Sequence, residues 1–399
     1  MKPITSGMTG AEFLAALNNI RKEYNVKDYG VVGNGSTDDT EAIQTLINTI
    51  CSVGENARIL FPVGIYVIAG AIQGTVDTIT YNSQLYIPAK NFNDTGRISI
   101  EFVGETVPNF VQSSGVGSAI SPIVGTIIRS TLVNDVDGAS IICSRGPDAN
   151  YSNFNYNHVS MRNISFQYTP DGDGACTISG LDFRKSANFN AENITIFPFN
   201  QNLVNSATPI NGAVGIRMPA VNCDNMNVLK QCTVGGFYDG YEISDHSVLR
   251  DCQAWVCYNG ISLMYNRLIS MVDKFEANWC KWAARVPGPS TTYFDIRDLS
   301  IEYTIDPPGK WYDYSGALID SGNLGKGRFE YTFHPRDLDQ DDIDFFNKTG
   351  GNNVQCVPII FHTATGFTIT GARDDGTALA DLITKLCTKF GFIDGTTAT

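Results

Sequence analysis

Three carboxylate residues occupy related positions in successive segments of the chain. Four segments align without gaps over their central parts, at offsets of 20, 23 and 24 residues: LKQCTVGGFYDG, LRDCQAWVCYNG, VDKFEANWCKWA and IRDLSIEY. If these segments are neighbouring strands, Glu276 lies diagonal to Asp251 and to Asp298, roughly 8 Å away between Cα atoms. Glycoside hydrolysis needs two carboxyl groups roughly 5 to 9.5 Å apart. The spacing therefore predicts Glu276 as one catalytic carboxyl, with Asp251 or Asp298 as its partner.

The residues around these carboxylates suit the binding of a sugar. The alignment predicts substrate-binding side chains from the same outward face: Trp255, Gln253, Asn278, Glu302 and Lys274. An indole ring covers sugar C–H groups, while amide and carboxylate groups bind the hydroxyls. An alternative is that Asp251, Lys274 and Asp298 form an alternating charge ladder without any chemistry. A lyase is a further alternative, with Lys274 as its base.

A second acidic group begins at the end of the first aligned segment. Asp239, Glu242 and Asp245 lie close to His246. Because this stretch is interpreted as a turn, solvated loop charge is the favoured explanation.

The inward positions of the same segments predict how the chain is built. One column consists of Cys232, Cys252, Phe275 and Leu299, and a second, two residues later, consists of Val234, Ala254, Ala277 and Ile301. Apolar residues two positions apart are typical of a strand with one buried face. No single segment can bury its own face, so the segments must stack. The stacked cysteines are expected to be reduced core thiols.

The stretch from Val26 to Ile68 has a different order of elements. VKDYG is interpreted as a short strand ending at Gly30, and the apolar spacing predicts a helix from Asp38 to Ile50. Asp38 is the expected N-cap, with Glu41 completing a capping box. ARILFPVGIYVI then predicts two strands joined by a Pro-Gly turn.

This stretch resembles the first segment of the pectate-lyase-like right-handed β-helix proteins. The resemblance covers about 45 residues and rests on Asp28, Tyr29, Gly30, Gly33, Gly35, Asp38, Asp39, Thr40, Ala42, Ile43, Phe61, Pro62, Gly64 and Tyr66. Asn34 departs from it, because family members usually have Asp there. The resemblance implies an all-β, right-handed parallel β-helix (a solenoid) with an N-terminal capping helix. The family includes glycoside hydrolases and many bacteriophage tailspikes.

The ends of the chain predict four regions. Residues 1–24 are expected to form a helix for oligomerisation or docking, 25–309 the β-helix, 310–376 a small β-rich extension and 377–399 a C-terminal helix. Phe13, Leu17, Ile20 and Tyr24 form a narrow apolar seam. The seam could dock on its own chain or meet two copies about a three-fold axis, which would give a homotrimer.

Composition limits the partners. The formal net charge of −13 disfavours nucleic acid. No stretch of about 18 apolar residues predicts a membrane span, and no secretion signal is apparent. The ten cysteines lack metal-site spacing, so neither a metal nor another cofactor is expected.

These observations predict a tailspike-like phage protein that binds and hydrolyses a bacterial surface glycan. It would be assembled in a host cytoplasm and located in the virion, in the tail or an appendage, in contact with other virion proteins. The alternatives are a non-catalytic virion appendage or glycan receptor-binding protein, and a polysaccharide lyase.

Overall fold

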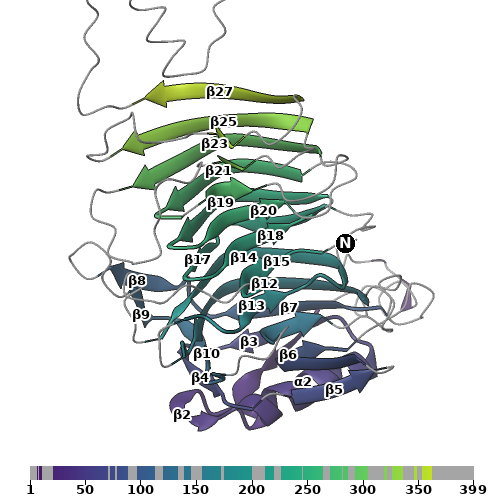
Figure 1. Cartoon of the computed structure of the whole chain (residues 1–399). Coiled ribbons are helices and arrows are strands. Elements are labelled where there is room, and N and C mark those ends of the chain that lie inside the picture. Colours follow the sequence, from purple (N-terminus) through teal and green to yellow (C-terminus); the bar gives the residue numbers. More distant parts are fainter. Residues whose placement is uncertain are drawn as a thin grey trace, which may run out of the picture.

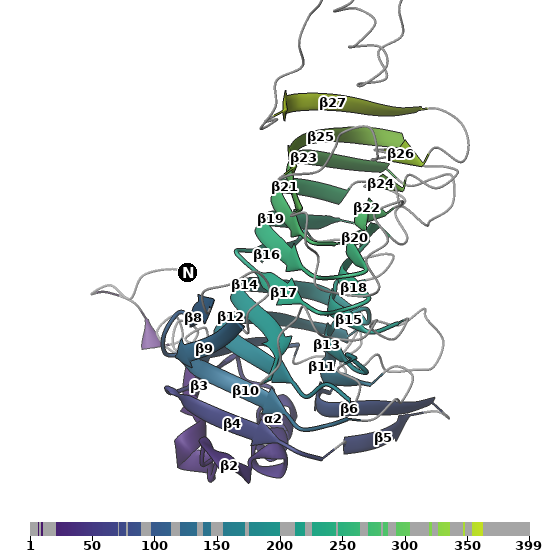
Figure 2. The same ribbon diagram turned by 60° about the vertical axis from the view of Figure 1, so that its left-hand side comes forward.

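Successive turns of the chain stack into a parallel β-helix, as the aligned segments predicted (Figures 1 and 2). Two large sheets run along the stack, and a small antiparallel sheet pairs β8 (Asn109–Gln112) with β9 (Ile120–Val124). The computed structural model describes residues 7, 9, 10, 21–70, 72–76, 79–88, 97–112, 120–133, 139–144, 155–171, 175–199, 212–219, 226–244, 246–263, 270–280, 282–285, 293–303, 319–320, 326–335, 346–347 and 353–361.

The first sheet contains 15 strands, and all of its described pairings are parallel. Its main path follows β1 (Lys22–Asn25), β3 (Ala57–Phe61), β7 (Ser99–Gly104), β12 (Asn155–Tyr168), β14 (Ser186–Pro198), β16 (Asn227–Lys230), β19 (Ser247–Trp255), β21 (Ser270–Asn278), β23 (Tyr293–Tyr303), β25 (Lys326–Pro335) and β27 (Asn353–Phe361). Beside this path lie β2 (Asn34–Asp38), β4 (Gly64–Ile68), β10 (Thr126–Ser130) and β17 (Thr233–Gly235).

The second sheet contains ten strands. Its order is β26 (Phe346–Asn347), β24 (Ile319–Asp320), β22 (Trp282–Arg285), β20 (Asn259–Leu263), β18 (Asp239–Ile243), β15 (Val214–Arg217), β13 (Ser179–Asp182), β11 (Ser140–Ser144), β6 (Ile79–Ile87) and β5 (Ile72–Val76). The pairings are parallel except between β5 and β6. Each coil therefore contributes to both sheets and encloses a common core.

The predicted inward columns are confirmed. Cys252 pairs with Phe275, and Phe275 pairs with Leu299. The register of the preceding pair, Thr233 with Gln253, places Cys232 next to Cys252. These four side chains are at most 1% exposed. The seven cysteines that the structure describes are buried free thiols, in agreement with the prediction.

The long strands of the first sheet bend at one recurring position. Six residues there have positive φ, between 50° and 59°: Asn163, Asn193, Gln231, Asp251, Lys274 and Asp298. The alignment treated the last four as an ordinary outward column of a flat strand, which is wrong. A left-handed residue turns the strand, so its two halves face different directions. At the first two bends, the Asn193 amide donates to Asn163 Oδ1 at 3.0 Å.

The helix α2 (Thr40–Val53) covers the N-terminal end of the stack (Figure 1). It begins later than predicted, its N-cap is Asp39, and the cap side chain makes no capping bond, so the predicted capping box is wrong. The Asp39 carboxylate instead accepts the amides of Val32 and Gly33, at 2.6 and 2.9 Å. Asp38 accepts the Thr40 amide at 3.0 Å. Both aspartates thus have structural roles in the turn before the helix.

The stretch VKDYG is not a strand. Val26–Tyr29 forms a 3-10 helix, η1, because the Asn25 side chain accepts the Lys27 amide and Gly30 closes the turn with a φ of 84°. Tyr24 lies in strand β1 and is 5% exposed in the core, so it does not belong to a helical seam. The rest of that seam, residues 13–20, lies outside the described residues.

The stack continues beyond the predicted boundary at residue 309. β25 pairs with β23, and β27 pairs with β25, all parallel and in the first sheet. The strands predicted for the extension are therefore further coils, at least to Phe361. The predicted C-terminal helix, residues 377–399, lies outside the described residues. Among the described residues, no helix has the length and apolar character needed to span a membrane.

Candidate functional site

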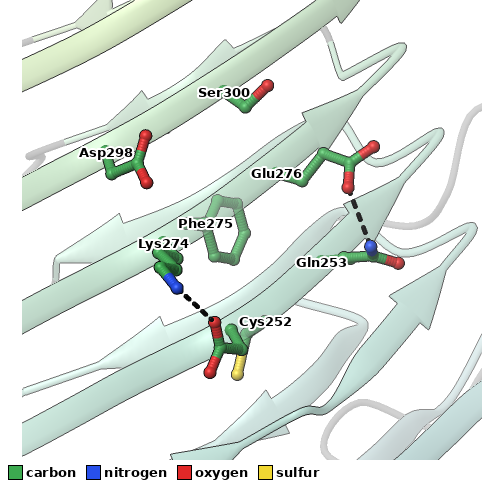
Figure 3. Close-up of a pocket in the computed structure, with 8 residues that line it drawn as sticks. Cys252, Gln253, Lys274, Phe275, Glu276, Asp298 and Ser300 are labelled. Atoms are coloured by element: carbon green, nitrogen blue, oxygen red, sulfur yellow. Dashed lines mark hydrogen bonds and ion pairs between the residues drawn. The ribbon is translucent and has the colours of Figure 1, made fainter.

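A hollow of about 230 Å³ lies on the outer face of the first sheet, across β19, β21 and β23 (Figure 3). Its polar lining residues are Asp251, Gln253, Lys274, Glu276, Asp298 and Ser300. We call this hollow the polar groove. It brings together the three carboxyls predicted to be catalytic and two of the predicted binding residues.

The Glu276 carboxylate is fixed by two amides. Gln253 Nε2 donates to one oxygen at 2.7 Å (Figure 3). Asn278 Nδ2 donates to the other at 2.6 Å. Trp255 Nε1 donates to Gln253 Oε1 at 3.4 Å. These side chains form a continuous relay in which each carboxylate oxygen retains a lone pair for a further hydrogen bond.

The two aspartates and Lys274 lie at the left-handed bend. Lys274 Nζ is 3.7 Å from Asp251 Oδ1, and the two side chains are 65% and 38% exposed. An ion pair this exposed contributes little to stability. The catalytic roles of Glu276, Asp251 and Asp298 remain predictions, because position alone does not test them.

Aromatic and distal residues complete the face. Trp255 meets Trp279 edge to face, with ring centroids 6.4 Å apart. The sequence interpretation missed Trp279 because it lies at a second left-handed position, with a φ of 53°, beyond the aligned strand. Glu302 pairs with Asn278 through the backbone, but its side chain lies outside the described part of the chain.

A second cluster lies on the outer face of the second sheet. Asp182, Arg217 and Glu242 are register neighbours on β13, β15 and β18, and Asp239 is on the same strand as Glu242. We call these four residues the charge row. The interpretation of Asp239 and Glu242 as solvated turn charge is therefore wrong. Asp245 lies outside the described residues.

Arg217 joins the carboxylates of the charge row. Its Nε donates to Glu242 Oε2 at 2.5 Å, and its Nη1 is 3.4 Å from Asp182 Oδ2. Arg184 adds a second cation, with Nη2 2.6 Å from Asp182 Oδ2. The side chains of Asp182, Arg217 and Glu242 are only 10%, 7% and 14% exposed. Charges this well buried interact much more strongly than surface pairs.

The environment pushes these carboxyl pKa values in opposite directions. Burial would raise the pKa of Asp182, but Arg184 and Arg217 outweigh it, and the pKa is lowered. Burial raises the pKa of Asp239 above its usual value of 3.8, against the hydrogen bonds from Ser262 and Asn259. Burial also raises the pKa of Glu242; Arg217 opposes this effect and Asp239 adds to it. Carboxyls with divergent pKa values are a common basis for acid–base catalysis.

The contacts of Asp239 orient its carboxyl. Ser262 Oγ and Asn259 Nδ2 both donate to Asp239 Oδ1, and these bonds limit the rise in pKa that burial causes. Ser262 is the register partner of Glu242 on the next coil, so the Asp239 carboxyl reaches toward that coil. In addition to burial, the charge of Asp239 raises the pKa of Glu242, so the two carboxyls interact.

Aromatic rings adjoin the charge row. Tyr238 and Tyr258 stack with centroids 4.6 Å apart and an interplanar angle of 9°. They directly precede Asp239 and Asn259, and Trp282 pairs with Asn259 on the following coil. Aromatic faces beside buried carboxyls are the composition expected of a sugar site. Within the described part of the chain, no group of three or more His, Cys, Asp or Glu residues could hold a metal ion.

The comparison with known families decides the relationship. The model described as "Rhamnogalacturonase A/epimerase, pectate lyase-like" matches residues 24–283. The chain belongs to this pectate lyase-like family. The match includes the charge row and most of the polar groove, and it confirms the resemblance first noted at the N-terminal segment.

Relatives of this pectate lyase-like chain match over a short segment. "Alginate lyase 7" of Azotobacter vinelandii is 36% identical over 92 residues, which cover 23% of this chain and 11% of that protein. "Mannuronan C5-epimerase AlgE5" of the same organism is 30% identical over 92 residues, which cover 23% and 9%. The chain thus spans about a tenth of the length of these relatives.

Two solved structures share most of the length of the chain. DFA-IIIase from Arthrobacter chlorophenolicus A6 in complex with GF2 is 13% identical and covers 86% of this chain and 85% of its own, with a TM-score of 0.47. ORF18 of Geobacillus virus E2 is 14% identical and covers 87% and 63%, with a TM-score of 0.38.

Proposed function

We propose that this pectate lyase-like protein binds and hydrolyses a polysaccharide of a bacterial surface, with its chemistry at the charge row. The observation that carries the proposal is geometric: Asp239 and Glu242 lie on one strand, β18, with Arg217 Nε bound to Glu242 Oε2 and with Asn259 bound to Asp239 Oδ1. The similarity to an alginate lyase and a mannuronan epimerase supports action on a glycan.

The proposed reaction uses Asp239 and Glu242, the two carboxyls with raised pKa values. Asp239 donates its proton to the glycosidic oxygen as the bond from that oxygen to the anomeric carbon breaks. The Glu242 carboxylate, oriented by Arg217, removes a proton from the water that attacks the anomeric carbon. If Glu242 instead adds to that carbon itself, water then cleaves the resulting ester, with the Asp239 carboxylate taking the proton of that water. The products are a new reducing end and a released hydroxyl. Asp182 stays ionised and holds Arg217 in place.

The biological setting is part of the same proposal. The end segments of the sequence support a homotrimeric phage tailspike located in the virion and attached to other virion proteins. A non-catalytic appendage that only binds glycan is the second candidate. The specific observation in its favour is the polar groove, whose hydrogen-bond relay suits binding without any acid.

A comparison of variants tests the proposal. Purified protein is incubated with a panel of bacterial surface polysaccharides, and both new reducing ends and absorbance near 235 nm, the general signature of an unsaturated uronate, are followed. For any polysaccharide that is cleaved, we expect Asp239→Asn and Glu242→Gln to lower turnover by roughly 100-fold or more.

Glu276→Gln separates the two candidate sites. If Glu276→Gln abolishes turnover and Glu242→Gln does not, the chemistry lies in the polar groove, as first predicted from the sequence. Absorbance near 235 nm without added water in the products would make the protein a lyase. A panel that is bound but never cleaved would establish the non-catalytic function.

A further inference from the structure

We propose that the polar groove is a separate binding site for an uncharged, hydroxyl-rich glycan strand that runs along the stack, and that it rejects uronates. This inference rests on the proposed glycan function and adds the class of substrate. It assigns Glu276 to the binding of hydroxyls rather than to cleavage.

The groove belongs to a longer polar row. Register pairing places one polar residue from each of six coils in line: Ser165, Thr195, Thr233, Gln253, Glu276 and Ser300. Ser165, Thr195 and Thr233 are buried, so the part of the row open to a ligand is Gln253, Glu276 and Ser300, which spans roughly 10 Å because strands lie about 4.8 Å apart. Between them, hydroxyl, amide and carboxylate groups donate and accept hydrogen bonds, as sugar hydroxyls require. The three partly exposed groups, one per coil, fit a short stretch of an extended chain that offers one sugar per coil.

Aromatic rings lie beside the polar row, on the side away from the left-handed bend. Trp255 is fixed by its hydrogen bond to Gln253 and by its contact with Trp279, and both rings are partly exposed. Phe197 and Val256, which are buried, support them from below. An indole held in a fixed position can cover a sugar face with little loss of side-chain entropy.

Charge defines the class of glycan. The groove contains three carboxylates, Asp251, Glu276 and Asp298, and among its described lining residues only one cation, Lys274. Lys274 is already within 3.7 Å of Asp251, so the groove has a net negative charge in an already acidic protein. A uronate carboxylate in the groove would be repelled, whereas neutral hydroxyls can bind to Glu276 without that penalty.

The site is distinct from the charge row. The charge row lies on the second sheet and the polar groove on the first, so one sugar ring cannot contact both. Two sites on different facets allow one stretch of polymer to be held while another is cleaved, which raises the effective concentration at the second site.

The test uses an array of oligosaccharides from bacterial surface polysaccharides, grouped into neutral chains and uronate-containing chains of equal length. We expect the bound oligosaccharides to be neutral, with uronate chains at least about tenfold weaker. Affinity for the neutral chains should not change between about 50 mM and 500 mM salt, because no charge is neutralised. Isothermal titration calorimetry gives each affinity.

Variants locate the binding in the groove. Trp255→Ala and Glu276→Gln should each weaken neutral binding by about tenfold, without lowering the thermal midpoint by more than a few degrees. Glu192→Gln is the matched control: Glu192 is 43% exposed on the outer face of β14, outside both sites, and should not alter binding.

The outcomes separate this inference from the proposed function. If cleavage depends on Glu242 and binding is unchanged by Trp255→Ala and Glu276→Gln, the polar groove is not a glycan-binding site. The proposed function would then stand. Preferred binding of uronates would overturn the assigned class. Binding that requires Trp255, with no cleavage, would support the groove and count against hydrolysis, and an array with no bound glycan would contradict both.

Discussion

At the scale of single residues, the buried carboxyl of Asp239 has a cost for folding when it is ionised. Its pKa is raised in the folded protein, so above that pKa the folded state loses stability relative to the unfolded chain, in which the usual value is about 3.9. As pH falls through the raised pKa, protonation removes this cost.

Asp239→Asn should therefore stabilise the protein at pH 7 while it abolishes turnover. The expected gain in the free energy of unfolding is about 1 kcal/mol, the usual scale for relieving a destabilised functional group. The gain should disappear at about pH 3, where the wild-type carboxyl is mostly neutral in both the folded and the unfolded state. Urea unfolding at both pH values measures it. Equal gains at the two pH values would contradict a raised pKa.

The left-handed bend gives a second prediction at this scale. Gln231 is exposed and has a φ of 52°, a region that Asn adopts more readily than Gln. Gln231→Asn should stabilise the protein by about 0.5 kcal/mol, and the β-branched change Gln231→Val should destabilise it by more than about 1 kcal/mol. Thermal unfolding of both variants measures these changes in stability. If the same two substitutions at Gln253, on the flat part of a strand, gave the same order of stability, the bend would not be the cause.

At the scale of elements, the strands of the second sheet depend on a ladder of glycines. Gly180, Gly215, Gly240 and Gly260 occupy successive coils, and a Cβ on each would lie 2.5 to 2.7 Å from the carbonyl oxygen of the next coil. That distance is too short for a real contact, so the coils could not stack at their present spacing.

Gly215→Ala should consequently destabilise the protein by about 2 to 3 kcal/mol through overpacking. The new Cβ would also meet the Val234 side chain at 3.0 Å, so the inner side offers no relief. Gly70→Ala is the control, because a Cβ there meets nothing within 4 Å. Unfolding in guanidinium measures both, and a Gly215→Ala variant as stable as Gly70→Ala would disprove the ladder.

Regular spacing made some elements predictable from the sequence, and the glycines concealed another. The inward columns around Cys232 and Cys252 were predictable because period-2 burial recurs at nearly constant offsets. The segment GFYDGYEISD looked like a turn because of Gly236 and Gly240, yet Gly240 lies in a strand whose close stacking requires it.

The charge row itself could not be derived from local pattern. Asp182 and Arg217 are 35 residues apart in sequence, and Arg217 and Glu242 are 25 apart. Coils of unequal length hide such a register. The bend was hidden for another reason: Lys274 and Gln231 are residue types that rarely adopt positive φ, and they interrupt the series of Asn and Asp residues at the bend in the other four coils.

At the scale of the whole molecule, we expect three chains to associate. The apolar seam of Phe13, Leu17 and Ile20, together with the C-terminal apolar positions Leu379, Leu382, Ile383 and Leu386, favours a three-fold arrangement. Light scattering at micromolar concentration should give about three times the chain mass of 43.5 kDa. Removal of residues 1–20 should shift the mass toward a monomer. A full-length chain that scatters as a monomer would refute the trimer.

The bend recurs at one position on six coils, so these coils repeat at a constant spacing along the stack. These six coils present the same facets, so one of them can be gained or lost without rotating the others. Loss of the 23 residues from Leu249 to Met271 would place Phe275 directly on Cys232 and shorten each facet by about 4.8 Å. Evolution could thereby change the length of the bound polymer in steps of one coil, while the side chains of each remaining coil are preserved.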